Sequence, residues 1–179
     1  YIALGMVALL LGTATLPSLA RKKKQVKAVA AEQDTIPAND KKRFDYFFLE
    51  AIRQVGLEQG RENCCYIHVV LVPYIKGSDE YKSKPAQHSV KELQGMGIAP
   101  NIIVMRADGP IDKEIFRKIS MFCNVKPDCV IENITLPVLY EAPLMLEKSN
   151  LSGIVCRELG LETPKPELTE WIQMVEKIR

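Results

Sequence analysis

The spacing of apolar residues changes repeatedly after residue 43, and this alternation limits the fold more than any other feature. Phe44, Phe48 and Ile52 recur at helical spacing, which predicts an amphipathic helix that ends near Gly56. The next apolar run, residues 67–74, is too short for a core helix and predicts a buried strand. A helix followed by a fully apolar strand is typical of a sheet that is covered by helices.

The same alternation continues toward the C-terminus. We expect a helix that runs out at Gly95 or Gly97, followed by a strand at residues 101–105. Asp112 suits the N-cap of the next helix, and residues 129–131 predict a third, short strand. Strands and helices that alternate at this spacing form a parallel sheet with right-handed crossovers. The sequence therefore predicts an α/β fold, followed by a helical C-terminal part.

Residues 1–43 do not fit this pattern. Residues 2–20 form an uncharged, largely apolar run that is long enough to cross a bilayer, and a basic cluster at residues 21–24 follows at once. We interpret residues 1–20 as either a transmembrane segment or a product of a misread gene, with a buried helix as a poorer alternative. Residues 21–43 are interpreted as a basic, polar linker. A genuine membrane segment would anchor a body that lies in the cytoplasm.

Composition excludes several functions. The net charge is only +2, and all of the basic excess lies in residues 1–43, since the rest of the chain is mildly acidic. General nucleic-acid binding is therefore not expected. The five cysteines show no CxxC spacing and there are only two histidines, so we assign no metal site and expect a reducing cytoplasm. Neither His68 nor His88 has an evident nucleophile beside it, and no catalytic residue is assigned.

The loop after Tyr74 is the first place to look for a ligand, because parallel sheets bind ligands at the carboxyl ends of their strands. Lys82 and Lys84 are two residues apart in a stretch expected to be extended, and Pro85 suits the first residue of a helix. Two ammonium groups at a helix N-terminus favour an anion such as a phosphate. A solvated lysine-rich loop is the alternative, and on the pattern alone it is the commoner outcome.

Four stretches, taken together, resemble the CTP synthase family. They are residues 48–54, 68–74, 82–93 and 122–125, and the third resembles the nucleotide loop of that family nearly residue for residue. Similarity extends from residue 48 to about the C-terminus. The third stretch also argues against other P-loop amidoligases, such as dethiobiotin synthetase or cobyrinate amidase.

The resemblance implies a ligase that uses ATP and Mg²⁺ to activate the 4-oxygen of UTP and then replaces it with ammonia from glutamine, which yields CTP. It also implies a homotetramer in which CTP is an allosteric feedback inhibitor. In that family the triphosphate of UTP or CTP is bound across a subunit interface. The matching residues here are Lys82, Ser83, Lys84, Pro85, Ala86 and Gln87, together with Lys118. The turn that contacts the adenine of ATP matches Ile134, Thr135 and Leu136, less specifically.

Several parts of the family pattern have no counterpart. Residues 42–47 replace an acidic segment, and residues 1–47 contain neither the glycine-rich phosphate loop nor the magnesium-binding carboxylates. We therefore interpret residues 44–179 as the C-terminal half of a synthetase domain with a partial P-loop-type sheet and without the glutaminase domain. Activity is not expected from this chain alone. The alternative is a non-catalytic, membrane-anchored nucleotide-binding module.

Overall fold

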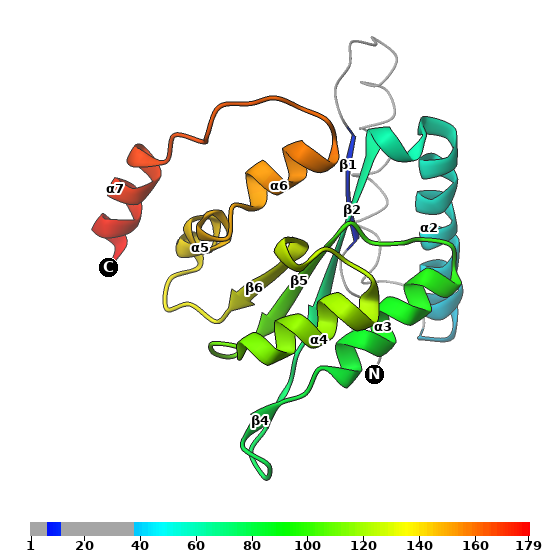
Figure 1. Ribbon diagram of the computed structural model, residues 1–179, viewed down its shortest axis with the longest axis horizontal. Helices are drawn as coiled ribbons and strands as arrows, with labels where there is room; N and C mark the ends of the chain where they lie inside the picture. The colour runs from blue at the N-terminus through cyan, green and yellow to red at the C-terminus, as the bar shows by residue number, and fades with distance from the viewer. Residues whose placement is uncertain (1–6, 12–37) are drawn as a thin grey trace.

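A four-stranded sheet forms the centre of the molecule. The computed structural model describes residues 7–11 and 38–179 (Figure 1). The strands lie in the order β1, β2, β5, β6, and β2, β5 and β6 run parallel. Their bounds are β1 (Val7–Leu11), β2 (Cys64–Leu71), β5 (Ile102–Ala107) and β6 (Val130–Ile134). The predicted α/β fold with a parallel sheet is confirmed.

Helices connect and cover these strands. Figure 1 shows α3 and α4 side by side in front of the sheet, α2 at one side, and α5, α6 and α7 beyond β6. The helical C-terminal part is confirmed as three helices. The helix bounds are α2 (Ala38–Gln59), α3 (Lys84–Gly95), α4 (Lys113–Cys123), α5 (Ala142–Lys148), α6 (Leu151–Glu158) and α7 (Thr169–Ile178).

The core lies between the parallel strands and their helices. Ile102, Ile103 and Met105 of β5 are fully buried, as the near-continuous apolar sequence of a central parallel strand requires. Ile119 of α4 packs into the same cluster. A smaller cluster joins Ile52 of α2 to the β2 side chains and the end of α3. Together these contacts hold the carboxyl ends of the three parallel strands at one edge.

Several boundaries differ from the sequence expectation. The first helix continues past Gly56 to Gln59. Gly56 does not end the helix but lets Tyr66 pack closely against it, since a Cβ at this position would overlap the Tyr66 hydroxyl oxygen. The helix ends before Gly60, whose φ of +84° favours glycine. The following strand begins at Cys64, not residue 67, because residues 64–66 are also buried and pair with β1. Helix α2 also begins at Ala38, inside the stretch expected to be linker.

The transmembrane interpretation of residues 1–20 falls mostly outside the described residues. Of that stretch the structure describes only β1, which pairs antiparallel with β2 and places Leu9 opposite Tyr66. No helix in residues 38–179 combines the length and apolar character needed to span a bilayer. Apart from β1, residues 1–37 lie outside the described ranges.

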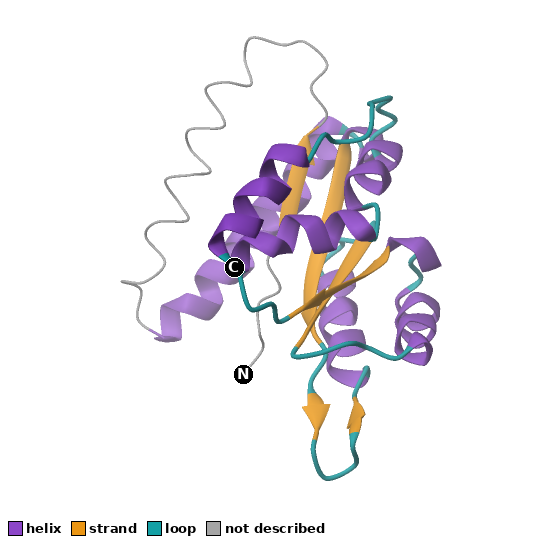
Figure 2. Ribbon diagram, turned by 90° about the vertical axis from the view of Figure 1, so that its left-hand side faces the viewer, coloured by secondary structure: helices purple, strands orange, loops and turns teal. Residues whose placement is uncertain are grey.

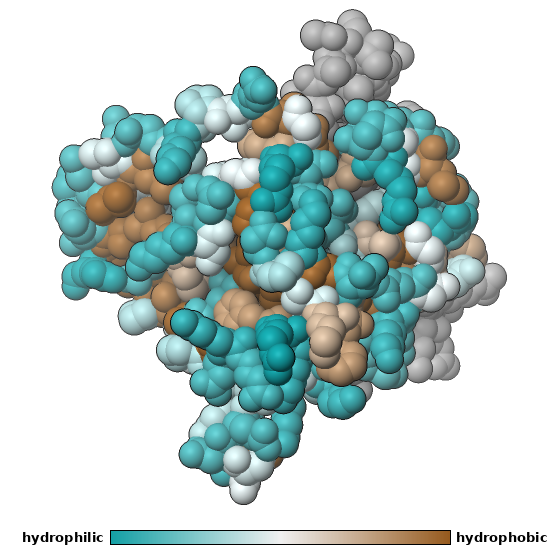
Figure 3. Space-filling view, viewed as in Figure 1, coloured by the Kyte–Doolittle hydropathy of each residue, from teal (hydrophilic) through white to brown (hydrophobic). Residues whose placement is uncertain are grey.

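A short hairpin projects from the carboxyl end of β2. Its strands are β3 (Tyr74–Ile75) and β4 (Glu80–Tyr81), and it extends away from the sheet in two perpendicular views (Figures 1 and 2). The rings of Tyr74 and Tyr81 pack edge to face with centroids 5.1 Å apart. The projecting tip is hydrophilic in Figure 3. The hairpin thus positions the start of the lysine loop beside the carboxyl edge of the sheet.

Candidate nucleotide-binding site

The lysine loop runs directly from the hairpin into α3. Ser83 is the N-cap of this helix, and Lys84 and Pro85 are its first two residues. The sequence expectation that Lys84 is extended and that Pro85 opens the helix is therefore wrong by one residue. Proline is accepted here because the N–H groups of a first helical turn have no partner within the helix.

The loop residues divide into buried and accessible groups. Ser83, Ala86 and Gln87 are buried, and the Gln87 side-chain amide donates to the Ser83 hydroxyl at 3.0 Å. The Gln87 backbone N–H also donates to the Ser83 carbonyl oxygen at 3.0 Å. These contacts fix the first turn of α3. The two lysines remain accessible: Lys84 is exposed and Lys82 is half-buried.

Lys118 reaches the same region from α4. Its Nζ lies 2.7 Å from Oε1 of Glu114, one helical turn earlier, and Lys82 is ion-paired with Glu80 of β4. The pKa of Glu80 is lowered first by the hydrogen bond from Lys82, and the positive charge of Lys118 lowers it further. The charges of Lys82 and Lys118 thus act on the same carboxylate, although 36 positions separate the two lysines in the sequence.

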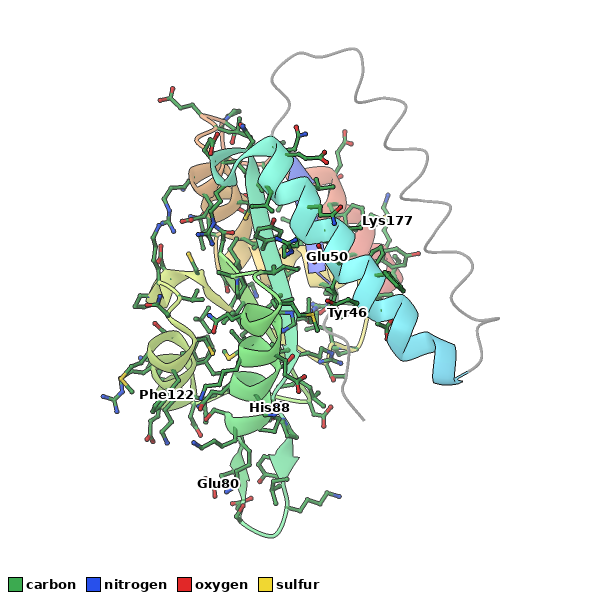
Figure 4. All side chains as sticks on the ribbon, turned by 90° about the vertical axis from the view of Figure 1, so that its right-hand side faces the viewer. Tyr46, Glu50, Glu80, His88, Phe122 and Lys177 are labelled. Atoms are coloured by element: carbon green, nitrogen blue, oxygen red, sulfur yellow. The ribbon has the colours of Figure 1, made fainter. Side chains whose placement is uncertain are left out.

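Lys84 has a different environment. Its Nζ lies 5.8 Å from the centroid of the Phe122 ring, which α4 contributes, within the range of a cation–π contact. Figure 4 shows Glu80, His88 and Phe122 toward the same end of the molecule. The basic cluster is thus framed by the hairpin, the start of α3 and one face of α4.

Arg106 joins the ends of β5 and β6, a role that was not predicted from the sequence. Arg106 donates from Nη2 to the Thr135 hydroxyl at 2.8 Å and from Nη1 to the Asn133 carbonyl oxygen at 3.3 Å. The Thr135 backbone N–H donates to the Ala107 carbonyl oxygen at 3.1 Å. The sequence did contain one indication of this role, since Arg106 is the only charged residue in the otherwise apolar strand β5. These bonds hold the turn at residues 134–136 against the sheet edge.

The same turn borders a cavity of about 710 Å³ between β6, α5 and α7. Ile134 and Leu136 line it from the turn, while Leu144 and Ile172 line it from the helices. Figure 3 shows apolar side chains gathered over this side of the molecule. Its volume lies within the range of small-molecule pockets, and charged side chains such as Glu141 and Arg179 also line it.

Neither histidine shows a catalytic arrangement. His68 is buried, its Nε2 lies 3.0 Å from the Ser89 hydroxyl, and burial lowers its pKa. Its Nδ1 has no hydrogen-bond partner among the described residues. His88 is exposed on α3, and its Nδ1 lies 3.5 Å from Glu92. His68 is thus a buried residue of β2, while His88 lies at the surface.

Within residues 7–11 and 38–179 there is no cluster of three or more histidine, cysteine or carboxylate side chains that could bind a metal ion. This finding concerns clusters of protein ligands alone, since Mg²⁺ is commonly held by one or two carboxylates together with substrate phosphates.

These features define an α/β domain with a basic cluster and an apolar hollow at the carboxyl edge of a parallel sheet, the edge at which such folds bind nucleotides. A family model described as CTP synthase N-terminus matches residues 42–161. The chain belongs to this CTP synthase family, an α/β ligase family.

Curated relatives agree with this assignment. The chain is 54% identical over 130 residues to the CTP synthase of Ruminiclostridium cellulolyticum, and the match covers 73% of this chain and 24% of the relative. It is 52% identical over 132 residues to the CTP synthase of Clostridium kluyveri, covering 74% and 25% respectively. For the CTP synthase of Geobacillus kaustophilus the identity is 51% over 132 residues, with the same two coverages. The match spans about a quarter of the length of these relatives.

Proposed function

We propose that this chain is part of a glutamine-dependent CTP synthase, which uses ATP to aminate UTP to CTP. Within that enzyme, the part described here binds the nucleotides. Family membership supports the reaction. The ion pair of Lys82 with Glu80, together with the effect of the Lys118 charge on the same carboxylate, supports the assignment of the site, because both positive charges act on one anionic group.

The triphosphate of UTP, or of CTP as feedback inhibitor, is proposed to bind to Lys82, Lys84 and Lys118. Compact ammonium groups suit a highly charged polyphosphate, and the first turn of α3 adds N–H groups and a favourable dipole. Ser83 and Gln87 support that turn from inside through their mutual hydrogen bond. Pro85 and Ala86, the remaining loop residues of the proposal, complete the turn without donating charge.

The adenine of ATP is proposed to lie against Ile134, Thr135 and Leu136. Two of these residues line the apolar cavity, and Arg106 fixes the third by its hydrogen bond at 2.8 Å. Mg²⁺, which the family implies, is proposed to accompany the phosphates of ATP. Ammonia derived from glutamine and assembly into a homotetramer complete the proposal.

Binding of CTP to the complete 179-residue chain tests the site. Isothermal titration calorimetry at low salt should show that Lys82→Ala and Lys118→Ala each weaken CTP binding about tenfold or more, since each removes a charge-assisted contact. Lys177→Ala is the matched control, because Lys177 lies on α7, away from the hairpin (Figure 4). Equal CTP affinity in all three variants would refute the proposed site.

A further inference from the structure

Two of the three lysines in the proposed nucleotide site already hold a carboxylate. Lys82 is paired with Glu80, and Lys118 is paired with Glu114. The two pairs influence each other. The positive charge of Lys118 lowers the pKa of Glu80, and the negative charge of Glu80 raises the pKa of Glu114, which its own pairing with Lys118 lowers more strongly. Within these two pairs, two positive and two negative side chains balance, and the nearby positive charge of Arg117 also lowers the pKa of Glu114.

We infer that Glu80 and Glu114 are internal counter-ions that compete with the nucleotide for Lys82 and Lys118. This inference rests on the proposed nucleotide site. Phosphate oxygens would replace the two carboxylates, which swing into solvent, and no covalent step is involved. The carboxylates therefore set the affinity of the site and select for polyphosphates, which can engage both lysines at once.

The geometry allows such an exchange. The exposed fractions of the paired side chains are 41% for Lys82 and 53% for Glu80, and 41% for Lys118 and 62% for Glu114. Ion pairs that solvent reaches this easily are weak and rearrange on fast timescales. A polyphosphate carries several charges and can offer each lysine an oxygen, so it outcompetes a single carboxylate.

Lys84 provides an internal contrast. It is exposed and lies over the Phe122 ring rather than against either carboxylate of the cluster. Neutralising Glu80 or Glu114 should therefore act on the contribution of Lys82 and Lys118 to anion binding. The contribution of Lys84 should not change.

The test uses inorganic tripolyphosphate and CTP as separate probes of the complete chain, by calorimetry at low salt. Glu80→Gln and Glu114→Gln should each tighten tripolyphosphate binding about two- to fivefold, and the double variant roughly tenfold. Glu58→Gln removes the same charge from the end of α2, which precedes the amino end of β2, and should leave the affinity unchanged. In the background of Lys82→Ala, Glu80→Gln should tighten tripolyphosphate binding less than in the wild-type background, because only the weaker influence of Glu80 on Lys118 then remains.

Unchanged or weaker tripolyphosphate binding in the double variant, including no binding by any variant, would overturn the inference. Weaker binding would mean that the carboxylates orient the lysines instead. The proposed nucleotide site is judged separately by CTP. If the double variant tightens tripolyphosphate binding but CTP binds no better than tripolyphosphate in any variant, the counter-ion role stands and recognition of the nucleoside fails.

Discussion

Replacing Gly56 by alanine should destabilise this protein, although alanine is the better helix former. Gly56 lies inside α2, where a change from glycine to alanine ordinarily stabilises by about 1 kcal/mol. Here the added methyl group would overlap the hydroxyl oxygen of Tyr66 and approach its Cζ to 3.0 Å. Tyr66 is only 7% exposed and packs with Ile52 and Leu93, so its ring has little room to retreat.

The expected magnitude follows from two opposed terms. Overpacking of a well-filled core lowers the free energy of unfolding by about 1–3 kcal/mol, and the higher helix propensity of alanine raises it by about 1 kcal/mol. The two terms leave a loss of about 0–2 kcal/mol in the free energy of unfolding, and the buried Tyr66 ring puts the expected loss in the upper half of that range, about 1–2 kcal/mol. Tyr66→Phe removes the oxygen that the methyl group meets, so the two changes should be coupled.

Chemical denaturation of the single and double variants measures this coupling. In the Tyr66→Phe background, Gly56→Ala should cost clearly less free energy of unfolding than in the wild-type chain. If Gly56→Ala leaves the free energy of unfolding of the wild-type chain unchanged or raises it, the packing argument is refuted. Equal effects in both backgrounds would show that the hydroxyl group is not the obstacle.

Three further outcomes are expected. Burial lowers the pKa of His68 below its ordinary 6.5, so the unfolded chain binds a proton at this residue more readily than the folded chain does. Lowering the pH from 7 to 5 should therefore lower the melting temperature less in His68→Gln than in the wild type. Burial raises the pKa of the Cys65 thiol to about 11, so mass spectrometry after brief alkylation at pH 8 should find Cys156 modified first. Glu158 is 13% exposed and accepts a hydrogen bond from Lys126 at 2.8 Å, so Glu158→Gln should cost ~1 kcal/mol in denaturant unfolding.

Periodicity predicted the three parallel strands and the helices between them, because these strands are buried and read as continuous apolar runs. It predicted neither β1 nor the β3–β4 hairpin. It could not place the end of α2, because Gly56 reads as a stop signal and only the position of Tyr66, on another element, shows that it is a packing site. The first three residues of β2 were missed for a similar reason. Two of them are cysteines, whose burial in strands is less evident from sequence than that of β-branched residues.

The candidate site was partly predictable. Lys82 and Lys84 are two residues apart, so their proximity follows from the chain itself. The position of Lys118 depends on how α4 packs beside α3, which no local pattern encodes, and resemblance to a family supplied it instead. Arg106 was missed because its role depends on hydrogen bonds to residues of the neighbouring strand, more than twenty-five positions away.

Local charge balance explains why composition gave no hint of an anion site. A region that binds a polyphosphate would be expected to add a basic excess, yet the carboxylates of Glu80 and Glu114 cancel the charges of Lys82 and Lys118. Glu114 and Lys118 are one helical turn apart, so the same geometry that aligns them on α4 places both toward the hairpin that carries Glu80. A site built in this way shows its positive potential only when the carboxylates move aside. Its affinity for anions should therefore depend on the carboxylates as strongly as on the lysines.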